Sequence, residues 1–466
     1  MPSSEKKKSS IAKKIIGIVL KVAISVLIVA LVITGINYAV LPANAYTRIQ
    51  FHDLYDKYGA NGENMDLVFI GTSHAYRCFD PQIFDEKLGV NSYNFGTSMQ
   101  TISTSYYLLK EILKTNTPKQ VVFELTYTCF NDKDHRPLKS VIASQYMRFS
   151  ANKIDFIAHE FDLENIFYAL LPAYCYRENL NPETLSKTLK AKTTAAYKDY
   201  DLSITKSKTE WMENKGYVYT DRSLSVYHVG QMDPEPWEAD EMSEKYLNYF
   251  YKIIDLCREK NIKLTIVTSP VPRASLLELG NYGEICEYFD KVAADNDITY
   301  YNLNLLRKEK LDLVSTDFYD SHHVNGASSK KVSEIIAEMM LKEENGTFNH
   351  NEYFYSSWDE AKSTIDYITN AYMTVEEDED NYYLTGHAHS GDDDAQYEYG
   401  FYLYNGSTAQ NVTLRDWSTD SVYKMPKNLT EDGSSWRIEV AARFVGSNTQ
   451  LVLCQRQILK FPREAS

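Results

Sequence analysis

The chain has 466 residues, which is too long for one ordinary hydrophobic core and predicts two or three domains. Hydrophobic residues make up 44% and charged residues 24%, a globular composition that excludes wholesale disorder and a collagen-like repeat. The net charge of −15 argues against a nucleic-acid-binding protein, because contact with phosphates requires a basic surface.

The amino-terminal segment predicts the cellular compartment. Residues 1–21 carry six lysines and one acidic residue, and the following 19 residues, 22–40, carry no charge. A helix of this length spans about 28 Å, close to the hydrocarbon thickness of a bilayer. Because lysines beside a span stay in the cytoplasm, residues 1–45 are predicted to be a basic tail and an uncleaved signal anchor, with the rest of the chain outside. A secreted protein, cleaved near Ala45 in the sequence Ala43-Asn44-Ala45, is the alternative.

Residues 46–345 alternate short apolar runs with amphipathic helical patterns. Strands are predicted at 67–70, 92–95, 120–125, 263–268 and 298–303, and helices at 102–113, 246–260, 282–295 and 328–341. This alternation is typical of a doubly wound α/β fold with a parallel sheet and helices on both faces. Such sheets bind their ligands beyond the carboxyl ends of the strands.

Two further regions have a different pattern. A helical insertion at about 132–242 interrupts the α/β pattern, and it is either a wall of the substrate cleft or a structural cap. Residues 346–466 show alternating aromatic runs separated by Asn-Gly, Asp-Gly and Gly-Ser turns, which predicts a β-sandwich accessory domain. We interpret its aromatic stripe as core, with sugar stacking as the alternative. Its acidic runs are interpreted as solvated surface, since they lack the spacing of an EF-hand calcium loop.

Three segments carry residues suited to nucleophilic catalysis. Ser73 follows the first strand in Gly71-Thr72-Ser73-His74, residues 94–98 follow the second strand, and residues 320–327 precede the last helix. A serine on a tight turn at the end of a strand is well placed as a nucleophile. A histidine removes its proton only when a carboxylate holds the imidazole in the right tautomer. Asp320 and His323 are three residues apart, so one loop can direct both toward Ser73.

These blocks resemble the SGNH/GDSL hydrolase superfamily, whose first block is a Gly-x-Ser turn and whose last block is Asp-x-x-His. More narrowly, Gly71-Thr72-Ser73-His74 resembles the membrane-anchored extracytoplasmic branch that includes D-alanyl transfer proteins and alginate O-acetylation proteins. The resemblance covers about residues 60–345. It implies a flavodoxin-like three-layer α/β sandwich, with the amino-terminal transmembrane helix and the carboxyl-terminal β-sandwich as additions.

The resemblance also implies roles for individual residues. Ser73 is the expected nucleophile, His323 the base and Asp320 its orienting acid, while the backbone N–H groups of Ser73 and Gly96 form the oxyanion hole. The third block of the superfamily supplies an Asn, but here the predicted third strand ends in Glu124-Leu125-Thr126-Tyr127, which leaves Asn131 as the nearest candidate. The residues expected around the triad are His74, His322 and Asn94.

The expected function is that of an extracytoplasmic serine esterase or acyltransferase at a bacterial cytoplasmic membrane. Its substrates are small acyl esters, acetyl or D-alanyl, of a surface glycan or teichoic acid, and a membrane-bound O-acyltransferase is a partner implied by the resemblance. No cofactor, metal or nucleic acid is expected. The rival function is a non-catalytic anchored protein that binds polysaccharide or acts as a scaffold. Two local alternatives remain: Ser73 as a helix cap, and a metal held by the histidines with Asp320.

Overall fold

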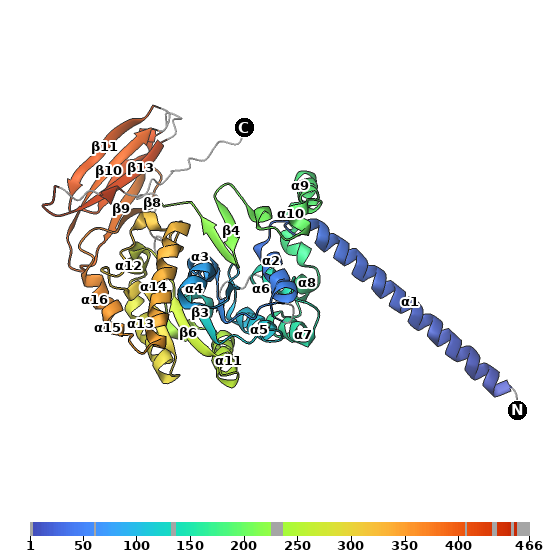
Figure 1. Cartoon of the computed structure of the whole chain (residues 1–466). Helices are drawn as coiled ribbons and strands as arrows, with labels where there is room; N and C mark the ends of the chain where they lie inside the picture. The colour runs from blue at the N-terminus through green and yellow to red at the C-terminus, as the bar shows by residue number, and fades with distance from the viewer. Residues whose placement is uncertain are drawn as a thin grey trace. The chain divides into compact units, whose positions relative to one another are not determined.

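The computed structural model describes residues 3–59, 62–131, 137–224, 236–405, 408–430, 436–448 and 452–453. Its contacts divide the chain into two compact units, Met1–His52 with His135–Lys206, and Asp53–Asp134 with Ser207–Ser466. We call the first the helical unit and the second the sheet unit. The division expected at residues 45 and 345 stays a prediction. Figure 1 shows the elements of both units.

The helical unit contains no strand in its described part. Its helices are α1 (Ser3–Val40), α2 (Tyr46–His52), α6 (Pro137–Ser144), α7 (Ala151–Glu160), α8 (Ile166–Leu170), α9 (Pro182–Lys192) and α10 (Ala195–Lys198), with the 3-10 helix η4 (Pro172–Leu180). Among the described residues, the segment Lys14–Val40 of α1 is the one helix long and apolar enough to cross a membrane, with a mean hydropathy of 3.0. By length and composition it fits a membrane anchor and a signal sequence alike.

A five-stranded parallel sheet forms the centre of the sheet unit. Its strands are β1 (Leu67–Ile70), β2 (Ser92–Asn94), β3 (Gln120–Glu124), β6 (Lys263–Thr268) and β7 (Thr299–Asn302), in the order β2-β1-β3-β6-β7. All five predicted strands are therefore confirmed, and their order is the flavodoxin-like one. β1 is buried along its whole length, which explains its continuous run of apolar residues.

Helices of this unit pack in two groups. They are α3 (Ser73–Cys78), α4 (Pro81–Leu88), α5 (Ile102–Ile112), α11 (Glu244–Glu259), α12 (Arg273–Leu279), α13 (Tyr282–Asp295) and α14 (Gly326–Glu344). α14 contacts α3 and α4, and α11 contacts α5. The four predicted helices are confirmed to within two or three residues at each end, whereas α3, α4 and α12 are too short to give a clear helical period in the sequence.

One structural element lies where the sequence predicts mainly helix. The hairpin of β4 (Glu210–Asn214) and β5 (Tyr217–Thr220) belongs to the sheet unit. Its turn is made by Lys215 and Gly216, both with positive φ, and the Lys215 carbonyl accepts a hydrogen bond from the N–H of Asn94 at 2.9 Å. The hairpin is thus fixed at the end of β2, a long-range contact that no local pattern in the sequence predicts.

The carboxyl-terminal part forms two antiparallel sheets after the short helices α15 (His350–Tyr353) and α16 (Trp358–Ser363). One sheet has the order β12-β9-β8 and the other β11-β10-β13-β14. The strands are β8 (Asn370–Glu377), β9 (Asn381–His389), β10 (Tyr397–Asn405), β11 (Gln410–Ser418), β12 (Val422–Pro426), β13 (Trp436–Phe444) and β14 (Val452–Leu453). Both sheets contribute to one apolar core that contains Leu384 and Phe401, which supports the interpretation of the aromatic stripe as core.

Candidate active site

Ser73 is the first residue of α3, directly after the turn that follows β1. Gly71 makes this turn with φ +147°, and a Cβ there would lie 2.6 Å from the Cβ of Glu124, so only glycine fits. The cap of α3 is Thr72, whose side chain accepts a hydrogen bond from the N–H of His74. The interpretation of Ser73 as the cap is therefore wrong, and its hydroxyl lies at the carboxyl edge of the sheet where the strand order reverses.

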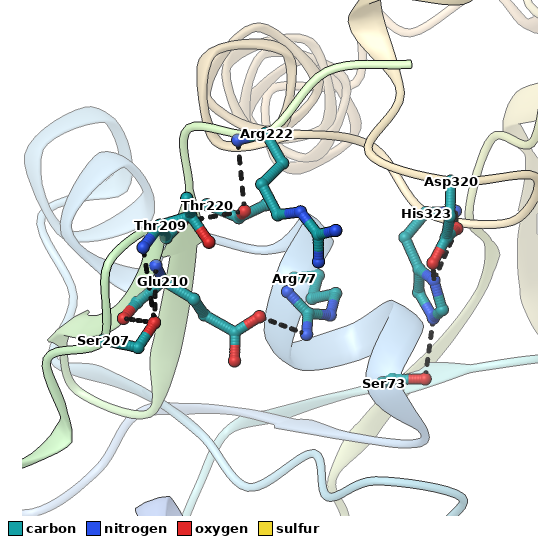
Figure 2. Close-up of polar contacts among 9 residues, drawn as sticks. All are labelled: Ser73, Arg77, Ser207, Thr209, Glu210, Thr220, Arg222, Asp320 and His323. Carbon is teal, nitrogen blue, oxygen red and sulfur yellow. Dashed lines mark hydrogen bonds and ion pairs between the residues drawn. The ribbon is translucent and has the colours of Figure 1, made fainter. Parts of the chain in front are cut away.

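The structure brings Ser73, His323 and Asp320 into one line of hydrogen bonds (Figure 2). Nε2 of His323 lies 2.8 Å from Oγ of Ser73. Nδ1 of the same ring lies 2.9 Å from Oδ1 and 3.0 Å from Oδ2 of Asp320. With Nδ1–H donating to the carboxylate, Nε2 is the acceptor for the serine proton, as general-base chemistry requires.

Asp320 is held by its own loop before α14. Its Oδ1 accepts hydrogen bonds from the backbone N–H groups of His322 and His323, each at 2.8 Å. The N–H of Tyr319 donates to the carbonyl of His323 at 2.8 Å, which closes the loop. Burial alone raises the pKa of Asp320, but the bond to His323 and the two backbone donors lower it to about 2. The carboxylate is therefore ionised at any physiological pH.

Two further histidines surround His323 without reaching Ser73. The ring of His74 stacks on the ring of His323 with 4.5 Å between centroids. Burial, followed by the nearby His323, lowers the pKa of His74 well below its usual value, and burial lowers the pKa of His322. In the described part of the chain, no group of three or more His, Cys, Asp or Glu side chains is placed to hold a metal ion. This geometry gives no support to the metal alternative.

Asn94 links the loop after β2 to α3. Its Nδ2 donates to the carbonyls of Ala75 and Phe79 at 2.8 and 3.0 Å, and its Oδ1 accepts the N–H of Gly96 at 2.9 Å. Gly96 packs so closely on α3 that a Cβ would lie 2.9 Å from the carbonyl oxygen of Thr72. The N–H of Gly96 is thus engaged by Asn94 and not directed at a substrate in this conformation, which differs from its expected place in the oxyanion hole.

The other two expected oxyanion donors are the N–H of Ser73 and Asn131. The N–H of Ser73 has no acceptor within the described chain, as befits the first residue of a helix. Asn131 ends the short 3-10 helix after β3, where its N–H donates to the carbonyl of Thr128 at 3.3 Å. The part of Asn131 in an oxyanion hole stays a prediction.

Glu124, at the end of β3, is a residue of the site that the sequence did not single out. Its Oε2 accepts hydrogen bonds from the N–H of Thr72 at 3.3 Å and from the Thr72 hydroxyl at 2.9 Å, and Thr126 donates to Oε1 at 2.9 Å. The side chain is 2% exposed, and burial raises its pKa to about 7 against the effect of these donors. The role of Glu124 could have been inferred from the expected pairing of β3 with β1, because this pairing places the residues that follow Ile70 beside Glu124.

Comparisons with known proteins give one family and several solved structures. A family model described as "Protein of unknown function (DUF1574)" matches residues 45–340. Among solved structures, a GDSL-like lipase from Bacteroides thetaiotaomicron is similar with 11% identity and a TM-score of 0.28, over 60% of this chain and 88% of its own. An acylhydrolase candidate from Bacteroides fragilis has 10% identity and a TM-score of 0.29, over 59% and 86%. At these scores neither likeness bears on the activity. No curated protein matches the sequence.

Proposed function

The chain belongs to the DUF1574 family, and we propose that it is a serine esterase or acyltransferase of the SGNH type that acts on small acyl esters. The observation that carries this proposal is the unbroken line from Oγ of Ser73 through His323 to Asp320. Stabilising a helix does not require an imidazole 2.8 Å from the serine hydroxyl, nor a carboxylate bonded to the other ring nitrogen. Nucleophilic catalysis requires both.

The proposed reaction has two steps with the same proton carrier. Oγ of Ser73 attacks the acyl carbonyl while Nε2 of His323 accepts the hydroxyl proton, and the ester C–O bond then breaks as that proton passes to the departing alcohol. This leaves the acyl group on Ser73. Water, or a hydroxyl of an acceptor, attacks the acyl-serine with His323 again as base and returns Ser73 to its free form. Asp320 stabilises the imidazolium in both steps.

Stabilisation of the oxyanion is the incomplete part of this site. Of the two expected backbone donors, the N–H of Ser73 is available and that of Gly96 is bound to Asn94. One donor contributes about 2.7–4 kcal/mol to the transition state of acyl transfer. We therefore expect slow turnover of simple esters, and release of Gly96 from Asn94 when substrate binds. The rival, a non-catalytic polysaccharide-binding or scaffold protein, is the outcome if turnover is absent.

We further propose that α1 is an uncleaved anchor. The carbonyl of Leu41 accepts a hydrogen bond from Nζ of Lys192 at 2.6 Å, and the Tyr38 carbonyl accepts a second one from the same amino group. Nδ2 of Asn179 donates to the carbonyl of Val40 at 3.2 Å. These contacts satisfy carbonyls that the end of a helix leaves without partners. Cleavage near Ala45 would strip Lys192, which is 3% exposed, of both acceptors.

An anchored chain with its bulk outside the membrane has surface polymers within reach. The proposed substrate is an acetyl or D-alanyl ester on a surface glycan or teichoic acid, and the proposed partner is a membrane-bound O-acyltransferase, on the resemblance of the Ser73 block alone. The test of the function is hydrolysis of 4-nitrophenyl acetate by the full chain in detergent. Turnover that is lost in both Ser73→Ala and His323→Ala supports the proposal, and turnover that survives in both contradicts it.

A further inference from the structure

Arg77 lies one helical turn after Ser73 on α3, beside the triad but not in it. The residue is only 7% exposed, and its Nη2 donates to Oε2 of Glu210 on β4 at 2.6 Å. Its other terminal nitrogen, Nη1, is buried and has no hydrogen-bond partner. Buried donors in folded proteins are nearly always bonded, so this one calls for an explanation.

Arg222, two residues after β5, shares an aromatic ring with Arg77. The guanidinium carbons of Arg77 and Arg222 lie 4.7 and 5.3 Å from the ring centroid of Tyr319. The same ring lies 5.9 Å from the ring of His323. Figure 2 shows the Arg222 side chain extending toward Arg77, with both on one side of the line that joins Ser73 to Asp320.

In the described part of the chain, Arg222 lacks the ion-pair partner that Arg77 has. Arg77 pairs with Glu210, but no carboxylate among the described residues lies within ion-pair distance of Arg222. Two guanidinium groups on one ring repel each other; Arg77 is buried, whereas Arg222 is exposed, so water weakens this repulsion on the Arg222 side. An arginine without an ion pair beside a paired one is notable in a chain whose net charge is −15. An anion between the two arginines removes the repulsion and supplies an acceptor for Nη1.

We propose that Arg77 and Arg222 form a subsite for an oxyanion, phosphate or carboxylate, carried by the substrate next to the ester that Ser73 attacks. Arginine is suited to this task because its planar fork of donors matches the oxygens of both groups. The inference rests on the proposed esterase function and narrows its substrate to an anionic polymer, with phosphodiesters or acidic sugars, as opposed to a neutral glycan.

The test is inhibition of 4-nitrophenyl acetate hydrolysis by sn-glycerol 3-phosphate, by glucuronate and by neutral glucose. One or both anions should compete, glucose should not, and the stronger inhibitor identifies the group as phosphate or carboxylate. Arg222→Gln should raise the inhibition constant of that anion at least tenfold. Arg258→Gln, which changes an exposed arginine on α11 paired with Asp255, is the matched control and should leave the constant unchanged.

Failure of the subsite and failure of the esterase are distinguishable. Active wild-type protein that neither anion inhibits, or whose inhibition is the same in Arg222→Gln, overturns the subsite and leaves the esterase standing. If the wild type hydrolyses nothing, calorimetric titration with the same two anions decides the subsite directly. Binding that is lost in Arg222→Gln supports it, and no binding to the wild type overturns it.

A second inference rests on an independent surface, the outside of the helical unit. Large apolar side chains are exposed there: Phe149, Ile154, Leu163, Phe167, Leu170, Tyr174 and Leu180. Leu163 is 93% and Phe149 86% exposed, which leaves these side chains almost wholly in contact with solvent. A concentration of this kind in a folded unit marks a contact surface.

The carboxyl end of α1 is bonded to the segment between Leu170 and Tyr174, two of these exposed residues. The Oδ1 of Asn37 accepts the N–H of Ala173 at 3.0 Å, at the start of η4 and three residues after Leu170. Basic residues accompany the apolar ones: Arg148 precedes Phe149, Lys153 precedes Ile154, and the guanidinium of Arg177 lies 5.0 Å from the ring centroid of Tyr174. Residues 135–206 hold ten Lys and Arg against eight Asp and Glu, a positive balance in an acidic chain.

We infer that this surface lies on the lipid bilayer, in the interface of the outer leaflet from which α1 emerges. Apolar, aromatic and basic side chains together are typical of segments that lie in the interface of a membrane with anionic lipids. The proposal rests on α1 as an anchor, and it explains why a unit built of short helices exposes so much apolar surface. It also places the helical unit directly at the membrane surface.

Brominated lipids test this placement, because they quench tryptophans that reach the bilayer. All five natural tryptophans lie outside residues 1–52 and 135–206, so Leu163→Trp supplies a reporter in the helical unit. The full chain is reconstituted into vesicles of brominated phosphatidylcholine and phosphatidylglycerol. The emission that Leu163→Trp adds to that of the wild type should be quenched by more than half. Val412→Trp, at an exposed site on β11, is the control and should show no added quenching. Equal emission from Leu163→Trp in brominated and plain vesicles overturns the inference and assigns the surface to a protein partner.

Discussion

The carboxylate of Glu124 accepts a hydrogen bond from the backbone N–H of Thr72, the residue that immediately precedes Ser73. A second bond joins the same oxygen to the Thr72 hydroxyl at 2.9 Å. Thr72 in turn caps α3, so the position of Ser73 depends on a buried acid at the end of a neighbouring strand. Glu124 is a positioning residue, since it acts on the serine through Thr72.

This relationship predicts an unusual dependence of stability on pH. The folded-state pKa of Glu124 is raised from 4.5 to about 7, so the folded protein keeps a proton that the unfolded chain releases between these values. The free energy of unfolding that this group contributes should therefore fall by about 3 kcal/mol as pH rises from about 4.5 to 7. Above pH 7 it should stay constant. Glu124→Gln should remove the dependence, because the amide is neutral throughout.

Chemical denaturation at pH 5 and pH 8 measures this effect. Glu124→Gln should match the wild type at pH 5 and exceed it at pH 8. Glu344→Gln, at an exposed position near the end of α14, should follow the wild type at both values. Wild type and Glu124→Gln with parallel pH profiles would show that the buried acid is ionised throughout the range.

The two adjacent histidines should respond differently to substitution. His322 contributes only its backbone N–H to Asp320, so His322→Ala should retain most of its turnover. Asp320→Asn preserves the shape but no longer selects the tautomer of His323, and it should lower kcat about 10³–10⁴-fold. Steady-state rates with 4-nitrophenyl acetate compare the two. A severe loss in His322→Ala combined with a mild one in Asp320→Asn contradicts the assignment of His323 as base.

Gly71 should tolerate no side chain, in contrast to another glycine of positive φ. In Gly71→Ala the new Cβ meets the Cβ of Glu124 at 2.6 Å, and the cost should be about 2 kcal/mol or more with loss of the Ser73 geometry. Gly89, with φ +66°, has nothing within 4 Å, and Gly89→Ala should cost about 1 kcal/mol from the backbone alone. Thermal unfolding ranks the pair, and an equal cost for both would refute the close contact.

The proposed topology predicts which part of the chain is accessible. In intact protoplasts of a bacterial host, added protease should digest the carboxyl-terminal sheets, while a tag placed before Ser3 should stay protected. Before protease is added, the tag should be found on full-length protein. Mass spectrometry of the untreated protein should find no amino terminus near Ala45. Protection of the carboxyl-terminal sheets, or a mature chain that begins after Ala45, contradicts the anchor.

Much of the fold could be predicted from local pattern, but the support of the site could not. The run at 67–70 has the unbroken apolar character of a strand covered on both faces, and the spacing of Asp320 and His323 is itself local. Glu124, by contrast, is an acid at the end of an apolar strand, and its role depends on which strand pairs with β3. The hairpin at Gly216 and the bond between Asn94 and Gly96 likewise arise from contacts between distant segments.

The central claim is that Ser73 is a nucleophile activated by His323, and covalent labelling tests it most directly. Full-length protein treated with a serine-directed phosphonate ester should gain one adduct, which peptide mapping by mass spectrometry should place on Ser73. Labelling should be absent in Ser73→Ala, and in His323→Ala it should be slower by orders of magnitude, since the hydroxyl then lacks its base. An adduct on another serine such as Ser98, or equal labelling in the wild type and Ser73→Ala, would contradict the account.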